Sequence, residues 1–153
     1  MKYRALFSSA VLATACLLLP GLASAQECSV NIDSTDAMRY DKDVIVVDKA
    51  CKEFTVNLTH SGKLGKNVMG HNWVLSKAGD VAAIAKEGIS AGLENNYLKP
   101  EDERVIAYTE IIGGGQETSV TFPVDKIKAA GEYVFFCSFP GHSTIMRGTL
   151  SLK

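Results

Sequence analysis

Short segments of this chain are either continuously apolar or alternate between apolar and polar residues, and both patterns are typical of β-strands. Segments rich in valine, isoleucine, threonine and phenylalanine occur at Val44 to Asp48, Phe54 to His60, Asn72 to Ser76, Val105 to Thr109, Thr118 to Val124, Tyr133 to Cys137 and Gly148 to Leu152. Turn-forming residues such as Ser61-Gly62 separate them. The pattern predicts an all-β fold, a Greek-key β-sandwich or barrel of about eight strands.

One stretch between the predicted strands has a different period. In residues 79–92 the apolar side chains of Val81, Ile84 and Ile89 approximate helical spacing, and Asp80 precedes them as a candidate N-terminal cap. We therefore predict one helical insertion near residues 79–92.

The first 25 residues have the composition of a secretory signal peptide. Basic Lys2 and Arg4 precede an apolar stretch, and small residues around Ala25 mark a cleavage site. We predict cleavage after Ala25, a single mature domain of residues 26–153 and a periplasmic location. The apolar stretch is too short for a comfortable membrane span, and no later segment approaches the required length, so no membrane span is expected.

The charge balance argues against one class of partner. Without Lys2 and Arg4, 14 basic residues remain against 17 acidic ones, which leaves a net charge of about −3. Binding to nucleic acid relies on an excess of positive charge, so DNA and RNA are not expected partners.

The predicted mature domain has three cysteines, and an odd number in an oxidising compartment needs an explanation. Pairing Cys28 with Cys51 closes a loop whose stabilisation is roughly 3 kcal/mol in the chain-entropy treatment, and it leaves Cys137 unpaired. A metal would protect Cys137 as a thiolate, whereas an inert buried cysteine is the alternative. Lipid attachment at Cys16 is ranked below cleavage after Ala25, because more apolar residues follow Cys16.

The run CSFPGHSTIM, residues 137–146, combines a thiol, an imidazole and a thioether. Cys137 and His142 are strong copper ligands, and Met146 is a weak one that tolerates both Cu(I) and Cu(II). His71 supplies a second imidazole from 66 positions before Cys137, so only a folded scaffold brings the set together. These residue types predict a mononuclear copper site that cycles between Cu(I) and Cu(II) and carries single electrons.

Several long segments resemble the azurins, bacterial members of the blue-copper cupredoxin family. They are CSV at Cys28, VDKACKEFTVNLTH, KNVMGHNWVLS, YLKP and FFCSFPGHSTIMRGTLSLK. The four residues between Cys137 and His142, and the three between His142 and Met146, are similar to the azurin spacing and differ from the shorter plastocyanin loop. The resemblance covers essentially the whole predicted mature domain and implies a cupredoxin-like fold.

The resemblance also implies the composition of the metal site. It implies one type 1 copper ion per chain, with a trigonal set of two imidazoles and one thiolate and two weaker contacts along the axis. The implied ligands are His71, Cys137, His142, Met146 and the carbonyl oxygen of Gly70. By the same resemblance, hydrogen bonds of Asn72 tie the two ligand segments together, the Phe139 N–H tunes the thiolate, and His60 lies near the site without being a ligand.

A docking surface is the last feature that the resemblance implies. His142 is expected to reach the surface within an apolar patch of Met38, Leu64, Met69, Phe139 and Gly141. A small apolar patch with adaptable methionines suits brief encounters with redox proteins. The expected partners are c-type cytochromes or periplasmic reductases and dehydrogenases. We expect a monomer that is not an enzyme.

Other interpretations of the same residues are weaker. A copper oxidase or nitrite reductase needs a second metal site and more histidines than the three present. A cysteine hydrolase based on Cys137 and His142 lacks an evident third group to orient the histidine, and Met146 would have no role in it. A copper store or chaperone would favour several exposed methionines or cysteines. Zinc is less suited to these ligands than copper, because the affinity order favours Cu(II).

Overall fold

The computed structural model describes residues 27–153. The predicted signal peptide, its cleavage site and Cys16 lie outside the described residues. None of the helices in residues 27–153 has the length and the hydropathy that crossing a bilayer requires.

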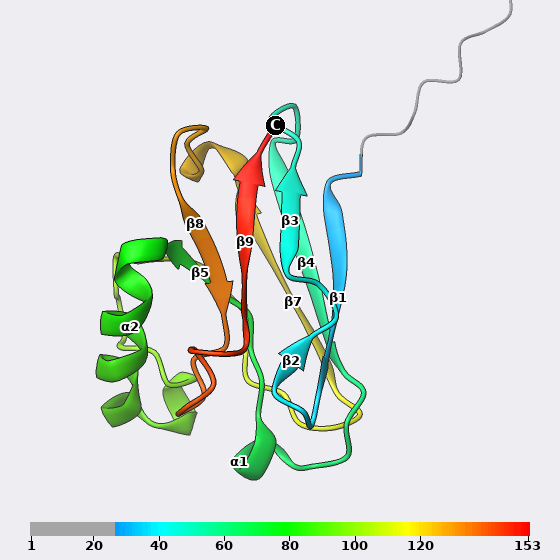
Figure 1. Cartoon of the computed structure of the whole chain (residues 1–153), viewed down its shortest axis with the longest axis vertical. Coiled ribbons are helices and arrows are strands. Elements are labelled where there is room, and N and C mark those ends of the chain that lie inside the picture. The colour runs from blue at the N-terminus through cyan, green and yellow to red at the C-terminus, as the bar shows by residue number, and fades with distance from the viewer. Residues whose placement is uncertain (1–26) are drawn as a thin grey trace, which may run out of the picture.

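The described residues form two β-sheets that pack face to face and contain nine strands (Figure 1). The first sheet has the order β2-β1-β4-β7, with β1 at Ser29–Thr35, β2 at Arg39–Tyr40, β4 at Glu53–His60 and β7 at Glu117–Pro123. The second has the order β3-β9-β8-β5-β6, with β3 at Val44–Val47, β5 at Val74–Lys77, β6 at Val105–Tyr108, β8 at Tyr133–Phe136 and β9 at Arg147–Leu152. The predicted all-β sandwich is confirmed, and the alternative of a closed barrel is wrong.

All seven predicted strands are present, and their ends lie within two residues of the predicted ones. The two additional strands are β1 and β2, which the sequence pattern did not reveal. In β1 the fully buried positions are Ile32 and Ser34, and the Ser34 hydroxyl donates a hydrogen bond to the Thr59 carbonyl at 2.8 Å. A serine at a buried position conceals the alternation, so the strand count is nine rather than about eight.

Strand β4 shows how alternation builds the core. Phe54, Val56 and Leu58 face inward and are at most 2 % exposed. They belong to one cluster with Phe135 of β8 and with Trp73, which directly precedes β5. The rings of Trp73 and Phe135 stack with centroids 5.8 Å apart. Burial of each such side chain contributes about 1.5–3 kcal/mol to folding, and the result is a firm base for the loops at the sandwich end.

Strand β8 is buried along its whole length because both of its faces are covered. One face meets the main core, and the other meets helix α2 (Val81–Gly88), which lies against the second sheet (Figure 1). This outer cluster contains Val74, Val81, Ile84, Leu98, Val134 and Phe136. The helical insertion predicted near residues 79–92 is therefore confirmed.

The ends of the insertion differ in detail from the prediction. Short 3₁₀ turns flank α2 at Ala78–Asp80 and Ile89–Ala91, and another follows at Leu93–Asn95. Asp80 stands directly before α2, but its side chain makes no capping hydrogen bond, so that part of the prediction is wrong. The structure adds one four-residue helix, α1 (Lys66–Met69), and a 3₁₀ turn at Val124–Lys126.

A disulfide joins Cys28 to Cys51 with a Cα–Cα distance of 5.7 Å, as predicted. It links the residue before β1 to the turn before β4. Cys137, the third cysteine of the predicted mature domain, is free and buried.

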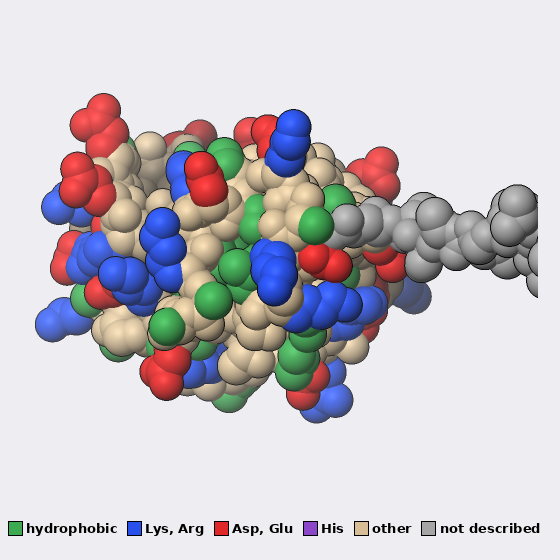
Figure 2. All heavy atoms as spheres, turned by 90° about the horizontal axis from the view of Figure 1, so that it is seen from above, with side chains coloured by type: hydrophobic (Ala, Val, Ile, Leu, Met, Phe, Trp, Pro, Cys, Tyr) green, Lys and Arg blue, Asp and Glu red, His purple; other side chains and the backbone are tan. Residues whose placement is uncertain are grey.

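The end of the sandwich that carries the C-terminus has a mixed surface (Figure 2). Basic and acidic side chains are interspersed on this face, with apolar side chains between them. A nucleic-acid-binding face would be predominantly basic. The view therefore agrees with the small net charge of the chain, −1.

Candidate metal centre

The loop between β8 and β9 lies at the end of the sandwich where α1 also lies (Figure 1). Cys137 directly follows β8, and its N–H donates to the Met146 carbonyl at 3.0 Å, which closes the base of the loop. The Pro140-Gly141 pair then forms a turn in which the His142 N–H donates to the Phe139 carbonyl at 3.0 Å. Gly141 has φ of +84°, a conformation that glycine adopts readily. The turn brings His142 back toward Cys137.

His71 approaches the same point from the segment before β5. Its backbone forms an isolated antiparallel bridge with Ile112, with hydrogen bonds of 3.0 and 2.9 Å. On its side chain, Nε2 lies 2.9 Å from the Thr35 carbonyl oxygen and donates to it. The other ring nitrogen, Nδ1, is therefore the one left for a metal.

The three side chains converge on one buried point. The Cys137 Sγ lies 3.8 Å from Nδ1 of His71 and 3.6 Å from Nδ1 of His142. The three potential ligand atoms all lie within 4.8 Å of one another, and the Gly70 carbonyl oxygen is 3.8 Å from the sulfur. Met146 is fully buried in the same cluster as Cys137, and the role of its thioether stays a prediction.

Burial dominates the electrostatics of the three groups. It raises the pKa of the Cys137 thiol to about 12, although the backbone N–H groups of Asn72 and Phe139 lower it in part. Burial also lowers the pKa of His71 to about 4, and it lowers the pKa of His142. Both imidazoles are thus neutral near neutral pH and can offer a lone pair. The thiol must release its proton when it binds a metal.

Asn72 holds the two ligand segments together, as expected. Its Oδ1 accepts the Ser138 N–H at 2.9 Å, and its Nδ2 donates to the Ser138 hydroxyl oxygen at 2.8 Å. Both residues are fully buried, so these bonds do not compete with bulk water. The candidate ligands His71 and Cys137 are each next in sequence to one member of this pair.

Known proteins provide an independent comparison. The family model for copper-binding proteins of the plastocyanin/azurin family matches residues 26–153. The azurin of Pseudomonas chlororaphis is 60% identical over 127 residues, 83% of this chain and 99% of that protein. The azurin of Bordetella pertussis (strain Tohama I) is 59% identical over 128 residues, 84% of this chain and 85% of that protein. This chain belongs to the plastocyanin/azurin family.

A solved structure supports the same assignment. The azurin Az-iso2 of the obligate methylotroph Methylomonas sp. strain J superimposes with a TM-score of 0.80 at 51% identity, over 82% of this chain and 98% of that chain. Copper is the cofactor of this family. Two neutral imidazoles and one thiol, all buried and converging, fit copper by their chemistry.

His60 lies next to this centre, but its ring nitrogens are not free to bind a metal there. Its ring stacks on His71 with centroids 4.6 Å apart. Its Nε2 donates to the Met69 carbonyl at 3.0 Å, and its Nδ1 accepts the Gly62 N–H at 3.0 Å. Neither nitrogen has a free lone pair directed at the centre. The expectation that His60 is not a ligand agrees with this arrangement.

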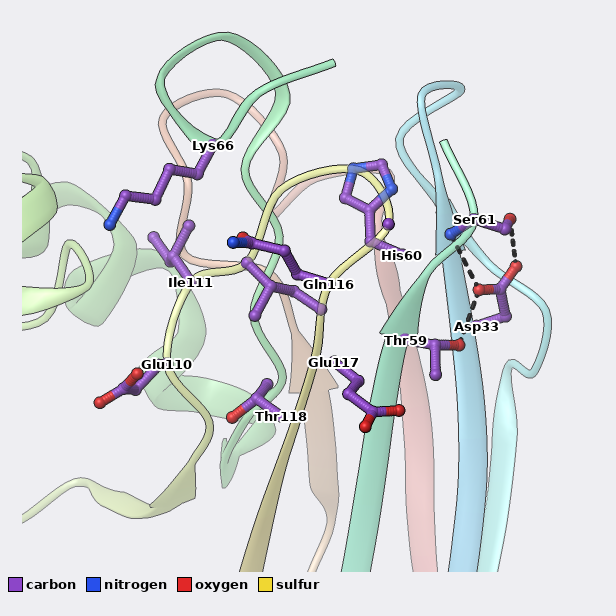
Figure 3. Close-up of a pocket in the computed structure, with 12 residues that line it drawn as sticks. Asp33, Thr59, His60, Ser61, Lys66, Glu110, Ile111, Gln116, Glu117 and Thr118 are labelled. Carbon is purple, nitrogen blue, oxygen red and sulfur yellow. Dashed lines mark hydrogen bonds between the residues drawn. The ribbon is translucent and has the colours of Figure 1, made fainter. Parts of the chain in front are cut away.

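A surface hollow of about 660 Å³ lies beside His60 (Figure 3). Its walls carry Lys66 as well as the carboxylates of Asp33, Glu110 and Glu117. In Figure 3 the carboxylate of Asp33 accepts hydrogen bonds from neighbouring residues of the wall. The three candidate ligands do not line this hollow, which is therefore separate from the metal centre.

The expected docking residues are only partly exposed. Leu64 is 41 % exposed, whereas Met38, Met69 and Phe139 are half-buried and His142 is only 4 % exposed. Gly141 is exposed.

Two apolar residues of the same segments were missed by sequence reasoning: Val68 of α1 and Ile145 of the ligand loop, which are 63 % and 60 % exposed. Large apolar side chains within polar turns that flank the ligands were the signal that could have identified them.

Proposed function

We propose that this protein is a periplasmic electron carrier that holds one type 1 copper ion. The proposed ligands are His71, Cys137, His142, Met146 and the carbonyl oxygen of Gly70. The observation that carries this proposal is the convergence of three buried donor atoms within 4.8 Å, from two segments far apart in the sequence. The proposal includes removal of residues 1–25 as a signal peptide, which leaves the domain 26–153.

The residues of the chain have three tasks in this function. When bound, copper supplies one-electron chemistry by alternating between Cu(I) and Cu(II). The Asn72–Ser138 pair and the Cys137–Met146 backbone bond keep the donor atoms in place, so that both oxidation states meet the same geometry. The donor atoms then move less when an electron is gained or lost. Burial of the ligands excludes water, and the hydrogen bonds to the Cys137 sulfur adjust its electron density.

Electron exchange with partners is proposed to occur through the surface around His142. The exposed apolar side chains of Leu64, Val68 and Ile145 lie in the segments that flank the ligands. Together with the expected patch of Met38, Leu64, Met69, Phe139 and Gly141, they suit a transient, weakly held partner. We propose c-type cytochromes or periplasmic reductases and dehydrogenases as partners, and a monomeric carrier.

One alternative is disfavoured by a specific observation. A cysteine hydrolase would need an accessible and easily ionised thiol. The Cys137 sulfur is close to His142, but the residue is 0 % exposed and burial raises the pKa of its thiol. A substrate has no access to such a thiol.

The proposed function is tested by visible spectroscopy. The purified protein with one equivalent of copper is expected to show an intense blue absorbance that bleaches with reductant and returns with oxidant. Cys137→Ser removes the thiolate and is expected to abolish the blue band. A colourless wild type, or a Cys137→Ser variant with the full spectrum, would overturn the proposal.

The docking surface is tested separately. We expect Met69→Lys and Val68→Lys to slow electron exchange with a c-type cytochrome about tenfold or more, because a buried lysine charge opposes an apolar contact. The copper spectrum should stay unchanged. Val46→Lys is a matched control, because Val46 is 49 % exposed on β3, outside the patch. Equal rates in all three variants and the wild type would contradict the assignment.

A further inference from the structure

The insertion between β5 and β6 touches the ligand loop through two consecutive residues, Asn96 and Tyr97. Both have a left-handed backbone, with φ of +54° and +49°. This conformation is uncommon for residues other than glycine, and for a tyrosine it is a clear outlier. Strained backbone of this kind persists only where surrounding contacts impose it, and it often occurs at functional sites.

Asn96 bonds to the ligand loop and to the segment that pairs with His71. Its carbonyl oxygen accepts the Ser138 hydroxyl proton at 2.7 Å. The Ser138 oxygen in turn accepts from Nδ2 of Asn72 at 2.8 Å, so the bonds form a continuous chain. The Asn96 side chain bonds to a different segment. Its Oδ1 accepts the Ile111 N–H at 2.8 Å. Ile111 directly precedes Ile112, the bridge partner of His71.

Tyr97 reaches the loop through its ring. It meets Phe139 edge to face, with centroids 5.3 Å apart and planes at 76°. Phe139 packs in turn on the His142 ring, with centroids 4.7 Å apart. A row of three rings therefore runs from the insertion to a proposed ligand, and aromatic pairs of this geometry contribute beyond their buried area.

The insertion is firm enough to act as a support. The backbone N–H groups of Asn96 and Tyr97 donate to the carbonyls of Leu93 and Gly92, both at 2.9 Å. Leu98, the next residue, is 4 % exposed and belongs to the cluster beneath α2. Near the other end of the insertion, Arg104 forms ion pairs with Glu87 of α2 and with Asp102.

We propose that the insertion is a buttress for the ligand loop, and that Asn96 and Tyr97 are its positioning residues. Asn96 fixes Ser138 and Ile111, and Tyr97 fixes Phe139, so Cys137 and His142 keep their places in the copper-free protein. The proposal has a second consequence: by positioning the ligand loop, the buttress also affects the reduction potential of bound copper. This consequence rests on the proposed function. The part that concerns loop order does not depend on metal binding.

The test uses four variants of the full-length chain. Asn96→Gly keeps the left-handed backbone and the carbonyl but removes Oδ1, and Asn96→Asp restores an oxygen acceptor. Tyr97→Asn removes the ring but retains a residue that tolerates positive φ. Asn95→Ala is the matched control, because Asn95 is exposed and its side chain bonds only to Ala91 within the insertion.

The first measurement is amide hydrogen exchange at Ile111, Ser138 and Phe139 in the copper-free proteins, normalised to Val56 and Leu58 in the core. The Ile111 amide reports the Asn96 side chain, and the Ser138 and Phe139 amides report the Tyr97 ring. We expect about tenfold faster exchange at Ile111 in Asn96→Gly, and at Ser138 and Phe139 in Tyr97→Asn, the effect of losing roughly one hydrogen bond or packing contact. Asn96→Asp and Asn95→Ala should match the wild type. Rates in Asn96→Gly and Tyr97→Asn no faster than in Asn95→Ala would overturn the proposal.

The second measurement is the reduction potential after copper loading. A displaced ligand loop changes the surroundings of the sulfur, so Asn96→Gly and Tyr97→Asn should shift the potential, whereas Asn95→Ala should not. A wild type that stays colourless with copper would refute the proposed function alone, because the exchange result on the copper-free proteins would still stand. An unchanged reduction potential in all variants would refute the effect of the buttress on the potential.

Discussion

Among single residues, Gly70 shows how packing rather than backbone conformation selects an amino acid at the metal centre. Its φ and ψ of −70° and 143° are accessible to any residue. A methyl group at this position would nevertheless collide with the Lys66 carbonyl and with the Ile111 side chain. The close approach keeps the Gly70 carbonyl beside the Cys137 sulfur.

We therefore expect Gly70→Ala to destabilise the copper-free protein by about 1–3 kcal/mol, the usual cost of overpacking. Gly79→Ala is the control, because the added methyl at that position has open space and meets no atom from elsewhere in the fold within 4 Å. Urea unfolding monitored by fluorescence measures the stability of both variants. Identical midpoints for the two variants would show that the segment yields easily, and the packing argument would fail.

Among the elements, the insertion depends on one charged cluster as well as on its apolar face. Arg104 donates to Glu87 at 2.7 Å and to Asp102 at 2.6 Å, which connects α2 to the approach of β6. The hydrogen bond from Arg104 is the main reason why the pKa of Asp102 is lowered, and it outweighs the opposite effect of burial. The pKa of Asp102 in the folded state therefore lies below its usual value of 3.8.

A lowered folded pKa stabilises the protein above the unfolded pKa, and this contribution disappears as the pH falls through the folded pKa. We expect Asp102→Asn to lower the free energy of unfolding by about 1 kcal/mol at about pH 7, since Arg104 remains partly solvated. As the pH falls below 3.8 and through the lower folded pKa, the difference should shrink. Denaturant titrations of both proteins across this range measure it. A constant difference would mean that the asparagine acts by some means other than charge.

In the whole molecule, the Cys28–Cys51 disulfide closes a loop that visits both sheets. The bridged residues precede β1 and β4 of the first sheet, and the loop between them includes β3 of the second. A covalent link here restricts the unfolded chain, because the loop ends cannot separate.

The double variant Cys28→Ser/Cys51→Ser is expected to lose roughly 3 kcal/mol of stability in the copper-free state. Its denaturant dependence should steepen, since an unbridged chain exposes more surface on unfolding. Guanidinium titrations compare it with the wild type, and an unchanged midpoint would refute the prediction. Blue colour after copper loading would show that the variant still folds.

Local pattern predicted the parts of the fold that depend on neighbouring residues. β4 is evident because its apolar side chains alternate with polar ones, and β8 is evident as a short continuous apolar run. β1 was missed because buried Ser34 is satisfied by Thr59, a partner 25 positions away. The Asp80 cap was expected from residue type, but its side chain makes no such bond in the fold.

The sequence by itself determined the chemistry of the centre, because thiol, imidazole and thioether groups are properties of residue types. Only the tertiary structure decided which atoms face the metal. Nδ1 of His71 is directed at Cys137 because Thr35 takes Nε2, whereas His60 is excluded because Met69 and Gly62 use both of its nitrogens. The contacts of Asn96 and Tyr97 with the ligand loop could not be predicted from the sequence either. Hydrogen-bond partners from distant segments come together only in the folded chain.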